Sequence, residues 1–180
     1  CSSDLFVNVR LIKFLDKKET IMAEGYVMDL RKKIGHVPMV IACASLIIYD
    51  ENRGILLQKR ADNGKWCYHG GSVEPNEKVE EAAKRELYEE VGLKAGKINL
   101  YTVASGTEQH FFYPNGDEVH IVDTVFICND FSGEILLEES EVLDCQWFAF
   151  DNLPEDILIA TRGPILSFCK EMLQKKADRK

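Results

Sequence analysis

The stretch that decides the fold is GSVEPNEKVEEAAKRELYEEVGL, which occupies residues 71–93. It begins as a glycine-containing turn, in which Asn76 is the expected helix N-cap and Glu77 favours the positive end of the helix dipole. Gly92 is expected to end the helix, because glycine readily adopts the left-handed conformation found at helix C-termini. Apolar residues between these points recur at helical spacing and predict one buried face: Val79, Ala82, Ala83, Leu87 and Val91.

Another face of this predicted helix carries three glutamates. Glu86, Glu89 and Glu90 stand at i, i+3 and i+4, a spacing that places their side chains about 5–6 Å apart. Like charges at that distance are destabilising unless a positive group lies between them, and Arg85 or a divalent metal ion can fill that role. Carboxylate oxygens on a rigid helix suit Mg²⁺ or Mn²⁺. The alternative is a solvated acidic face without a ligand.

The same stretch resembles the signature of the Nudix hydrolase family at every defined position. These positions are Gly71-x5-Glu77-x7-Arg85-Glu86-Leu87-x-Glu89-Glu90-x-Gly92-Leu93. The resemblance implies the α+β class as an α/β/α sandwich, a mixed β-sheet packed between helices, over about residues 37–173. Many family members carry proline where His69 stands, so the entry to the signature departs from the usual pattern.

The resemblance also implies an enzyme. Its expected activity is divalent-metal-dependent cleavage of a pyrophosphate bond in a nucleoside diphosphate derivative, by attack of water at phosphorus. A nucleotide sugar, ADP-ribose, a dinucleotide and a nucleoside triphosphate all remain open as substrates, and Mg²⁺ is the expected cofactor, with Mn²⁺ able to substitute. The alternatives are a non-catalytic nucleotide or metabolite sensor and a diphosphate isomerase. The intact signature favours the hydrolase, because sensors often lose its glutamates and the isomerases depart from it.

The resemblance implies a catalytic set of five residues: Glu77, Arg85, Glu86, Glu89 and Glu90. Within this set Glu86 and Glu90 would be the primary metal ligands, and Glu89 would bind a further metal ion or its water shell. The carbonyl of Gly71 is an expected extra ligand, because a residue without a side chain lets the backbone approach an ion. Glu77 would either join a metal or accept hydrogen bonds from the arginine, which would fix the cluster without binding metal.

The general base is open between a glutamate of the signature and one from a distant acidic loop. The loop candidates are Glu138, Glu139 and Glu141, with a solvated acidic loop as the alternative. Glu118 and His120 are weaker candidates for lining the cleft. Four further residues are candidates for substrate contact, against a structural role for the histidine and the tyrosines: Arg60, Tyr68, His69 and Tyr113.

The composition of the chain limits the classes of partner that we expect it to bind. The net charge of the chain is −8, which argues against binding of nucleic acid polymers, since their binding surfaces are basic. The six cysteines form no C-x-x-C pair, so reduced thiols in a cytoplasmic protein are expected. No apolar run reaches the length of a membrane span, and no signal peptide is recognisable at the start. The expected partner is a small-molecule nucleotide, with no membrane, and a homodimer is left open.

The chain is expected to hold one domain at residues 37–180 after an N-terminal extension at residues 1–36. Codons for Lys17-Lys18-Glu19 can form a purine-rich run before Met22, so one hypothesis is that Met22 is the natural start and residues 1–21 are not native. The expected strands span residues 37–49, 55–60, 98–104, 108–113, 118–128 and 142–150. A terminal helix with an apolar face follows, and the first strand is expected to be buried on both faces.

Overall fold

The computed structural model describes residues 25–113 and 115–179. The chain separates into two units between Gly35 and His36, and each is described by itself. In the first unit the described residues form helix α2 (Gly25–Ile34), within the expected N-terminal extension. The helix ends at Gly35, which has φ of 67° and donates its N–H to the carbonyl of Arg31 at 2.8 Å. The hypothesis about residues 1–21 lies outside the described residues.

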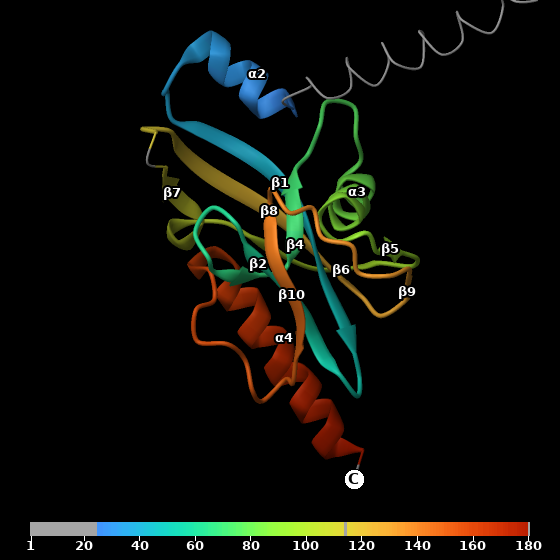
Figure 1. Cartoon of the computed structure of the whole chain (residues 1–180). Coiled ribbons are helices and arrows are strands. Elements are labelled where there is room, and N and C mark those ends of the chain that lie inside the picture. Colours follow the sequence, from blue (N-terminus) through green and yellow to red (C-terminus); the bar gives the residue numbers. More distant parts are fainter. Residues whose placement is uncertain (1–24, 114, 180) are drawn as a thin grey trace, which may run out of the picture. The chain divides into compact units, whose positions relative to one another are not determined.

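The second unit is built on a mixed sheet of eight strands within the described ranges. Helix α3 packs against one face and helix α4 against the other (Figure 1). The main order is β10-β2-β1-β8-β6, in which β1 and β8 are parallel and the other neighbours antiparallel. The elements are β1 Met39–Asp50, β2 Gly54–Arg60, β3 Trp66–Cys67, β4 His69–Ser72, α3 Val79–Val91, β5 Lys94–Ala95, β6 Asn99–Ala104, the 3-10 turn η1 Thr107–Gln109, β7 His110–Phe112, β8 Glu118–Cys128, β9 Phe131–Ser132, β10 Val142–Phe148 and α4 Ile159–Asp178.

This arrangement is the α+β sandwich that the sequence predicts. Strand β1 is central, and its side chains alternate between two apolar clusters. Leu46 and Ile48 pack with Leu87 of α3, whereas Ile47 packs with Phe168 of α4. Only the second half of β1 is buried on both faces, because α3 and α4 cover that half. Val40 in the first half is 74% exposed.

Helix α3 begins later than predicted. Its N-cap is Lys78, whose N–H points to the Glu81 carboxylate at 3.5 Å, so the assignment of Asn76 as the N-cap was wrong. Asn76 instead has φ of 67° and forms part of the preceding turn. The predicted end is confirmed: Gly92 has φ of 73° and donates its N–H to the carbonyl of Tyr88. The turn before α3 therefore holds Glu77 outside the helix, free to meet other side chains.

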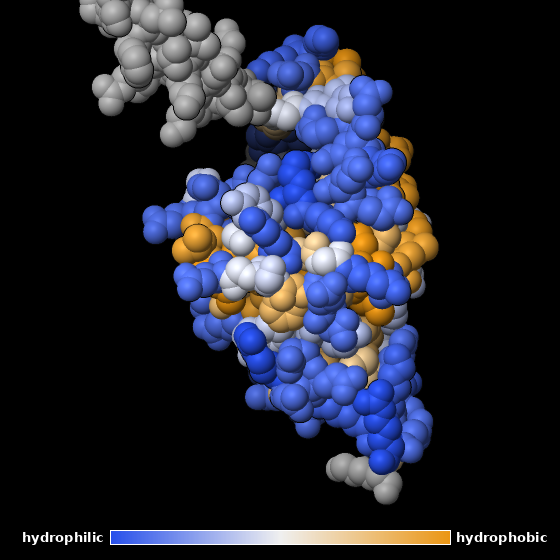
Figure 2. Space-filling model, turned by 90° about the vertical axis from the view of Figure 1, so that its right-hand side faces the viewer, coloured by the Kyte–Doolittle hydropathy of each residue, from blue (hydrophilic) through white to orange (hydrophobic). Residues whose placement is uncertain are grey.

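The remaining predicted elements differ mainly at their ends. The expected strand at 108–113 is shortened, because residues 107–109 form the turn η1 before β7. The strand expected at 142–150 ends at Phe148. No helix in the described ranges is long and apolar enough to cross a membrane. The face of the molecule in Figure 2 is largely hydrophilic, with hydrophobic residues in separate patches.

Candidate active site

Arg85 organises the acidic face of α3. Its Nε and Nη2 donate to the two carboxylate oxygens of Glu77 at 2.7 and 3.0 Å, a bidentate pair. Its Nη1 donates to Glu86 at 2.7 Å and to Glu89 at 2.9 Å, and Nη2 also reaches the carbonyl of Ser72. The guanidinium lowers the pKa of Glu77. One arginine thus fixes three of the glutamates that the sequence singles out, and it joins the turn before α3 to the helix.

Glu90 occupies a different environment, because its side chain is buried in the unit. Its Oε1 accepts a hydrogen bond from Gln58 Nε2 at 2.6 Å, and its Oε2 accepts the N–H of Gly70 at 3.0 Å. Burial nevertheless raises the pKa of Glu90 to about 8, and the charge of Glu86 adds to the increase. Donors aimed at both oxygens favour the ionised carboxylate, while burial opposes it. A bound cation would resolve this conflict.

Glu86 lies directly against the glycine turn. A Cβ built on Gly71 would come within 2.6 Å of the Glu86 carboxylate, so only glycine leaves room for this approach. Burial raises the pKa of Glu86, and the charges of Glu89 and Glu141 act in the same direction. Arg85 offsets part of this repulsion. The site therefore concentrates more negative charge than the arginine neutralises.

These carboxylates fit a divalent cation. Hard oxygen donors on Glu86 and Glu90, with Glu89 beside them, are the groups that Mg²⁺ and Mn²⁺ prefer. The raised pKa values of Glu86 and Glu90 have the physical cause that such a cation would remove, namely burial of negative charge. Glu77 is already held by the bidentate Arg85. Of the two roles that the sequence allows for it, the geometry favours support of the cluster.

The acidic loop between β9 and β10 contains three glutamates, and the charge of one of them acts on the cluster. The charge of Glu141 contributes to the raised pKa of both Glu86 and Glu90. Glu138 instead accepts the hydroxyl of Ser140 at 2.9 Å, although its backbone N–H donates to the carbonyl of Glu90. Glu141 is therefore the loop glutamate best placed to act on the cluster.

A cavity opens beside the carboxylates, and Gly70 and Gly71 form part of its wall. Its lining includes Asp123, a buried carboxyl that accepts hydrogen bonds from the hydroxyls of Ser45 and Tyr68 at 2.8 Å each. Burial raises the pKa of Asp123. The other lining residues are Cys43, Arg60, Asp62, Asn63, Cys67, Gln109, Phe111, Tyr113, Ile121, Leu158, Ala160 and Thr161.

Three of the four substrate-contact candidates line this cavity, namely Arg60, Tyr68 and Tyr113. Arg60 is paired with Asp62 through two hydrogen bonds at 2.8 and 2.9 Å. The fourth candidate, His69, is completely buried, and burial lowers its pKa to about 3. Its neutral ring bonds through Nδ1 to the Gln58 side chain at 3.0 Å. His69 thus supports Gln58, which in turn holds Glu90.

Sequence reasoning missed Gln58, Ser45 and Asp123, which hold or line the site. The signal for Asp123 is a carboxyl within the largely apolar run Ile-Val-Asp-Thr-Val, and Gln58 is the first polar residue after Ile-Leu-Leu. A buried polar group requires hydrogen-bond partners, so a polar residue that follows or interrupts an apolar strand is a candidate site residue. Glu118 and His120 do not line the cavity.

Comparison with known proteins identifies the family to which this fold and site belong. The family model of the NUDIX domain matches residues 39–167. That range covers more than half of the chain, and the protein belongs to the Nudix family.

Comparisons with individual proteins support this family assignment. NAD-capped RNA hydrolase NudC of Haemophilus influenzae is 31% identical over an alignment of 128 residues, and the match covers 67% of this chain and 45% of that protein. Nucleoside triphosphatase NudI of Escherichia fergusonii is 32% identical over an alignment of 124 residues, and the match covers 59% of this chain and 82% of that protein. The crystal structure of a MutT NUDIX hydrolase from Burkholderia pseudomallei superimposes with a TM-score of 0.61 at 32% identity, covering 70% of this chain and 95% of that one. The chain spans less than half the length of its NudC relative.

Proposed function

We propose that this chain hydrolyses a pyrophosphate bond in a nucleotide, using Mg²⁺ held by Glu86 and Glu90. The observation that carries the proposal is that two adjacent glycines contact both the cavity and the carboxylates. Gly70 lines the cavity and donates its N–H to Glu90, and Gly71 lines it while lying against Glu86. A substrate seated in the cavity would therefore present its phosphates to the acidic cluster.

In this mechanism the protein supplies position and electrostatics. When bound, a divalent cation supplies neutralising charge for the pyrophosphate and acidifies a water ligand. Gln58 and the N–H of Gly70 keep both oxygens of Glu90 oriented, and Arg85 keeps Glu77 and Glu86 in register. Such fixed ligands avoid reorganisation during the reaction.

For the general base we propose Glu141, which belongs to the acidic loop that is joined to α3 by the N–H of Glu138 on the carbonyl of Glu90. Of the three loop glutamates, it is the one whose charge acts on both Glu86 and Glu90. A carboxylate there would accept the proton from the attacking water. Glu89 is the alternative within the signature: its side chain is 56% exposed and is bound to Arg85.

For the substrate we propose a nucleoside triphosphate or a nucleoside diphosphate derivative. The cavity combines the aromatic rings of Phe111 and Tyr113 with the polar groups of Gln109 and Asp123. A ring surface together with a few directed polar groups suits a nucleobase. The relatives NudI and NudC bear the names of a nucleoside triphosphatase and an NAD-capped RNA hydrolase, so both substrate types belong in a test.

We further propose a cytoplasmic location and a domain that spans residues 37–180. The five described cysteines are free thiols, as expected in a reducing compartment. The family match over residues 39–167 falls inside the proposed domain. Cell fractionation would test the location, and limited proteolysis would test the boundary.

The test of the activity is release of phosphate from a substrate panel, coupled to a phosphatase or a pyrophosphatase. The panel contains nucleoside triphosphates, nucleotide sugars, ADP-ribose, dinucleotides and NAD-capped RNA, each with Mg²⁺, Mn²⁺ or EDTA. We expect turnover that requires the metal and that falls by at least about 100-fold in Glu90→Gln.

The matched control is Glu80→Gln, an exposed glutamate on the same helix. It should leave turnover unchanged. Equal activity of Glu90→Gln and the wild type would contradict the metal assignment. Lack of turnover across the panel, with Mg²⁺ bound to the folded protein, would favour a nucleotide sensor.

A further inference from the structure

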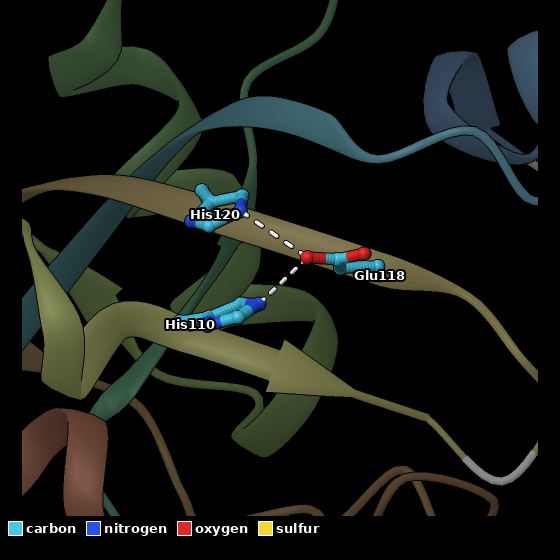
Figure 3. Close-up of side chains that lie close together, drawn as sticks. All are labelled: His110, Glu118 and His120. Carbon is cyan, nitrogen blue, oxygen red and sulfur yellow. Dashed lines mark hydrogen bonds and ion pairs between the residues drawn. The ribbon is translucent and has the colours of Figure 1, made fainter.

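A second cluster of ligand groups lies on the β7–β8 hairpin. His110 and His120 stand directly opposite each other across the two strands, and Glu118 lies two residues before His120 on the same side of β8. Figure 3 shows a nitrogen of each imidazole ring directed at the same oxygen of the Glu118 carboxylate. One ligand atom from each residue lies within 4.8 Å of the other two.

The distances are close to those of a tetrahedral metal centre. Glu118 Oε1 lies 2.9 Å from His110 Nε2 and 3.6 Å from His120 Nε2. Metal–ligand bonds of about 2.0–2.2 Å place ligand atoms about 3.3–3.6 Å apart in a tetrahedron. The rings are stacked with centroids 4.1 Å apart and planes 11° apart, so the two imidazoles lie side by side at the same edge of the Glu118 carboxylate. A cation would lie in both ring planes only after the imidazoles rotate out of this stack, and the partly exposed position of both side chains allows that rotation.

This cluster is separate from the proposed active site. Successive residues of a strand point to opposite faces of the sheet, and Phe111 and Ile121, the immediate neighbours of the two histidines, line the cavity. His110, Glu118 and His120 therefore face away from that cavity. Their side chains are 29%, 25% and 46% exposed, so solvent and ions reach them directly.

The donor set differs from that of α3 and selects a different ion. Two imidazole nitrogens and one carboxylate suit Zn²⁺, whereas Mg²⁺ prefers oxygen ligands alone. Three protein ligands in a partly exposed position leave a fourth coordination position for water. We propose that His110, Glu118 and His120 form a second metal site, which binds Zn²⁺ in preference to Mg²⁺.

A metal at this site would tie the three-residue strand β7 to β8. The site would then stabilise the hairpin whose opposite face contributes Phe111 to the cavity wall. Because this proposal concerns metal binding, it stands or falls independently of hydrolysis.

The test is titration of the full chain with Zn²⁺ against a chromophoric zinc chelator, in excess Mg²⁺ to occupy the carboxylates of α3. We expect one Zn²⁺ per chain in the wild type and in Glu90→Gln. Replacement of a ligand, as in His120→Ala or Glu118→Gln, should weaken binding by more than about tenfold, since loss of even an outer-shell partner costs that much.

The matched control is His36→Ala, because His36 also pairs with a carboxylate, Asp117 at 2.9 Å, but is not part of the three-ligand group. It should bind Zn²⁺ as tightly as the wild type. Substitution with Co²⁺ gives a second measurement: four-coordinate Co²⁺ absorbs strongly in the visible range, and His120→Ala should lose this absorption. Absence of Zn²⁺ binding, or equal binding by the wild type and His120→Ala, would overturn the proposal.

Discussion

The metal-free protein should lose stability as the pH rises from about 5 to 9. Replacement of Glu90 by glutamine should remove most of this loss. Burial raises the pKa of Glu90 to about 8 from an ordinary value of 4.5. Below about pH 4.5 the carboxyl is protonated in both states, so it does not favour unfolding. As the pH rises toward 8 the unfolded chain releases this proton while the native protein retains it, and the native state loses stability.

The size of this effect follows from the two pKa values. Between about pH 5 and pH 9 the difference in proton binding lowers the free energy of unfolding by about 4 kcal/mol. Glutamine cannot ionise and has nearly the same shape, so the variant lacks this contribution. Gln58 and Gly70 both donate hydrogen bonds to Glu90. In the variant the NH₂ group of the new glutamine would face one of these donors, which would lower the free energy of unfolding by about 1–3 kcal/mol at every pH.

The assay is urea unfolding, followed by tryptophan fluorescence in EDTA, at several pH values from about 5 to 9. The quantity of interest is the slope of unfolding free energy against pH, compared between the wild type and Glu90→Gln. We expect a steeper fall with pH in the wild type and its reversal by Mg²⁺ at high pH. Parallel slopes in EDTA would refute the reasoning, because they would mean that Glu90 does not retain its proton in the native state.

Three further substitutions test the parts of the site separately. Arg85→Lys keeps the charge but loses the bidentate pair, so we expect at least about tenfold weaker Mg²⁺ activation, measured from metal titrations of turnover. Gly71→Ala places a Cβ within 2.6 Å of the Glu86 carboxylate, and turnover should fall by at least about tenfold while circular dichroism shows a folded protein. Glu141→Gln should lower turnover by about 100-fold or more, whereas the exposed Glu139→Gln should stay within about twofold; equal effects of the two would exclude Glu141 as the base.

The sequence predicted best what depends on short-range spacing. The end of α3 at Gly92 is fixed by local backbone chemistry, and the contacts of Arg85 with Glu86 and Glu89 lie within one turn of helix. The strand at 118–128 has a long apolar pattern, and β8 matches it from end to end. The helix start was wrong because Asn76 is a good cap by type, and nothing local showed that a turn with positive φ would occupy that position.

The rest of the site depends on strand pairing that local pattern does not encode. Gln58 reaches Glu90 across 32 positions of sequence, and Ser45 reaches Asp123 across 78. These contacts exist because β1 pairs with β8 and helix α3 packs on the sheet. His69 is buried for the same reason, since β4 pairs with the central strand opposite Leu46. Motif spacing identified the acidic cluster of α3, whereas the topology determines what surrounds it.

The parallel pairing of β1 with β8 has a consequence for synthesis of the protein. Met39 pairs with Val119, so the partner of the central strand emerges from the ribosome 80 residues later. At about 5–20 residues per second this delay lasts about 4–16 s. During that time β1 can pair with β2 and β4, but its other edge stays open, and an open apolar edge invites aggregation. Slow translation beyond β4 should therefore lower the yield of folded protein more than slow translation after β8.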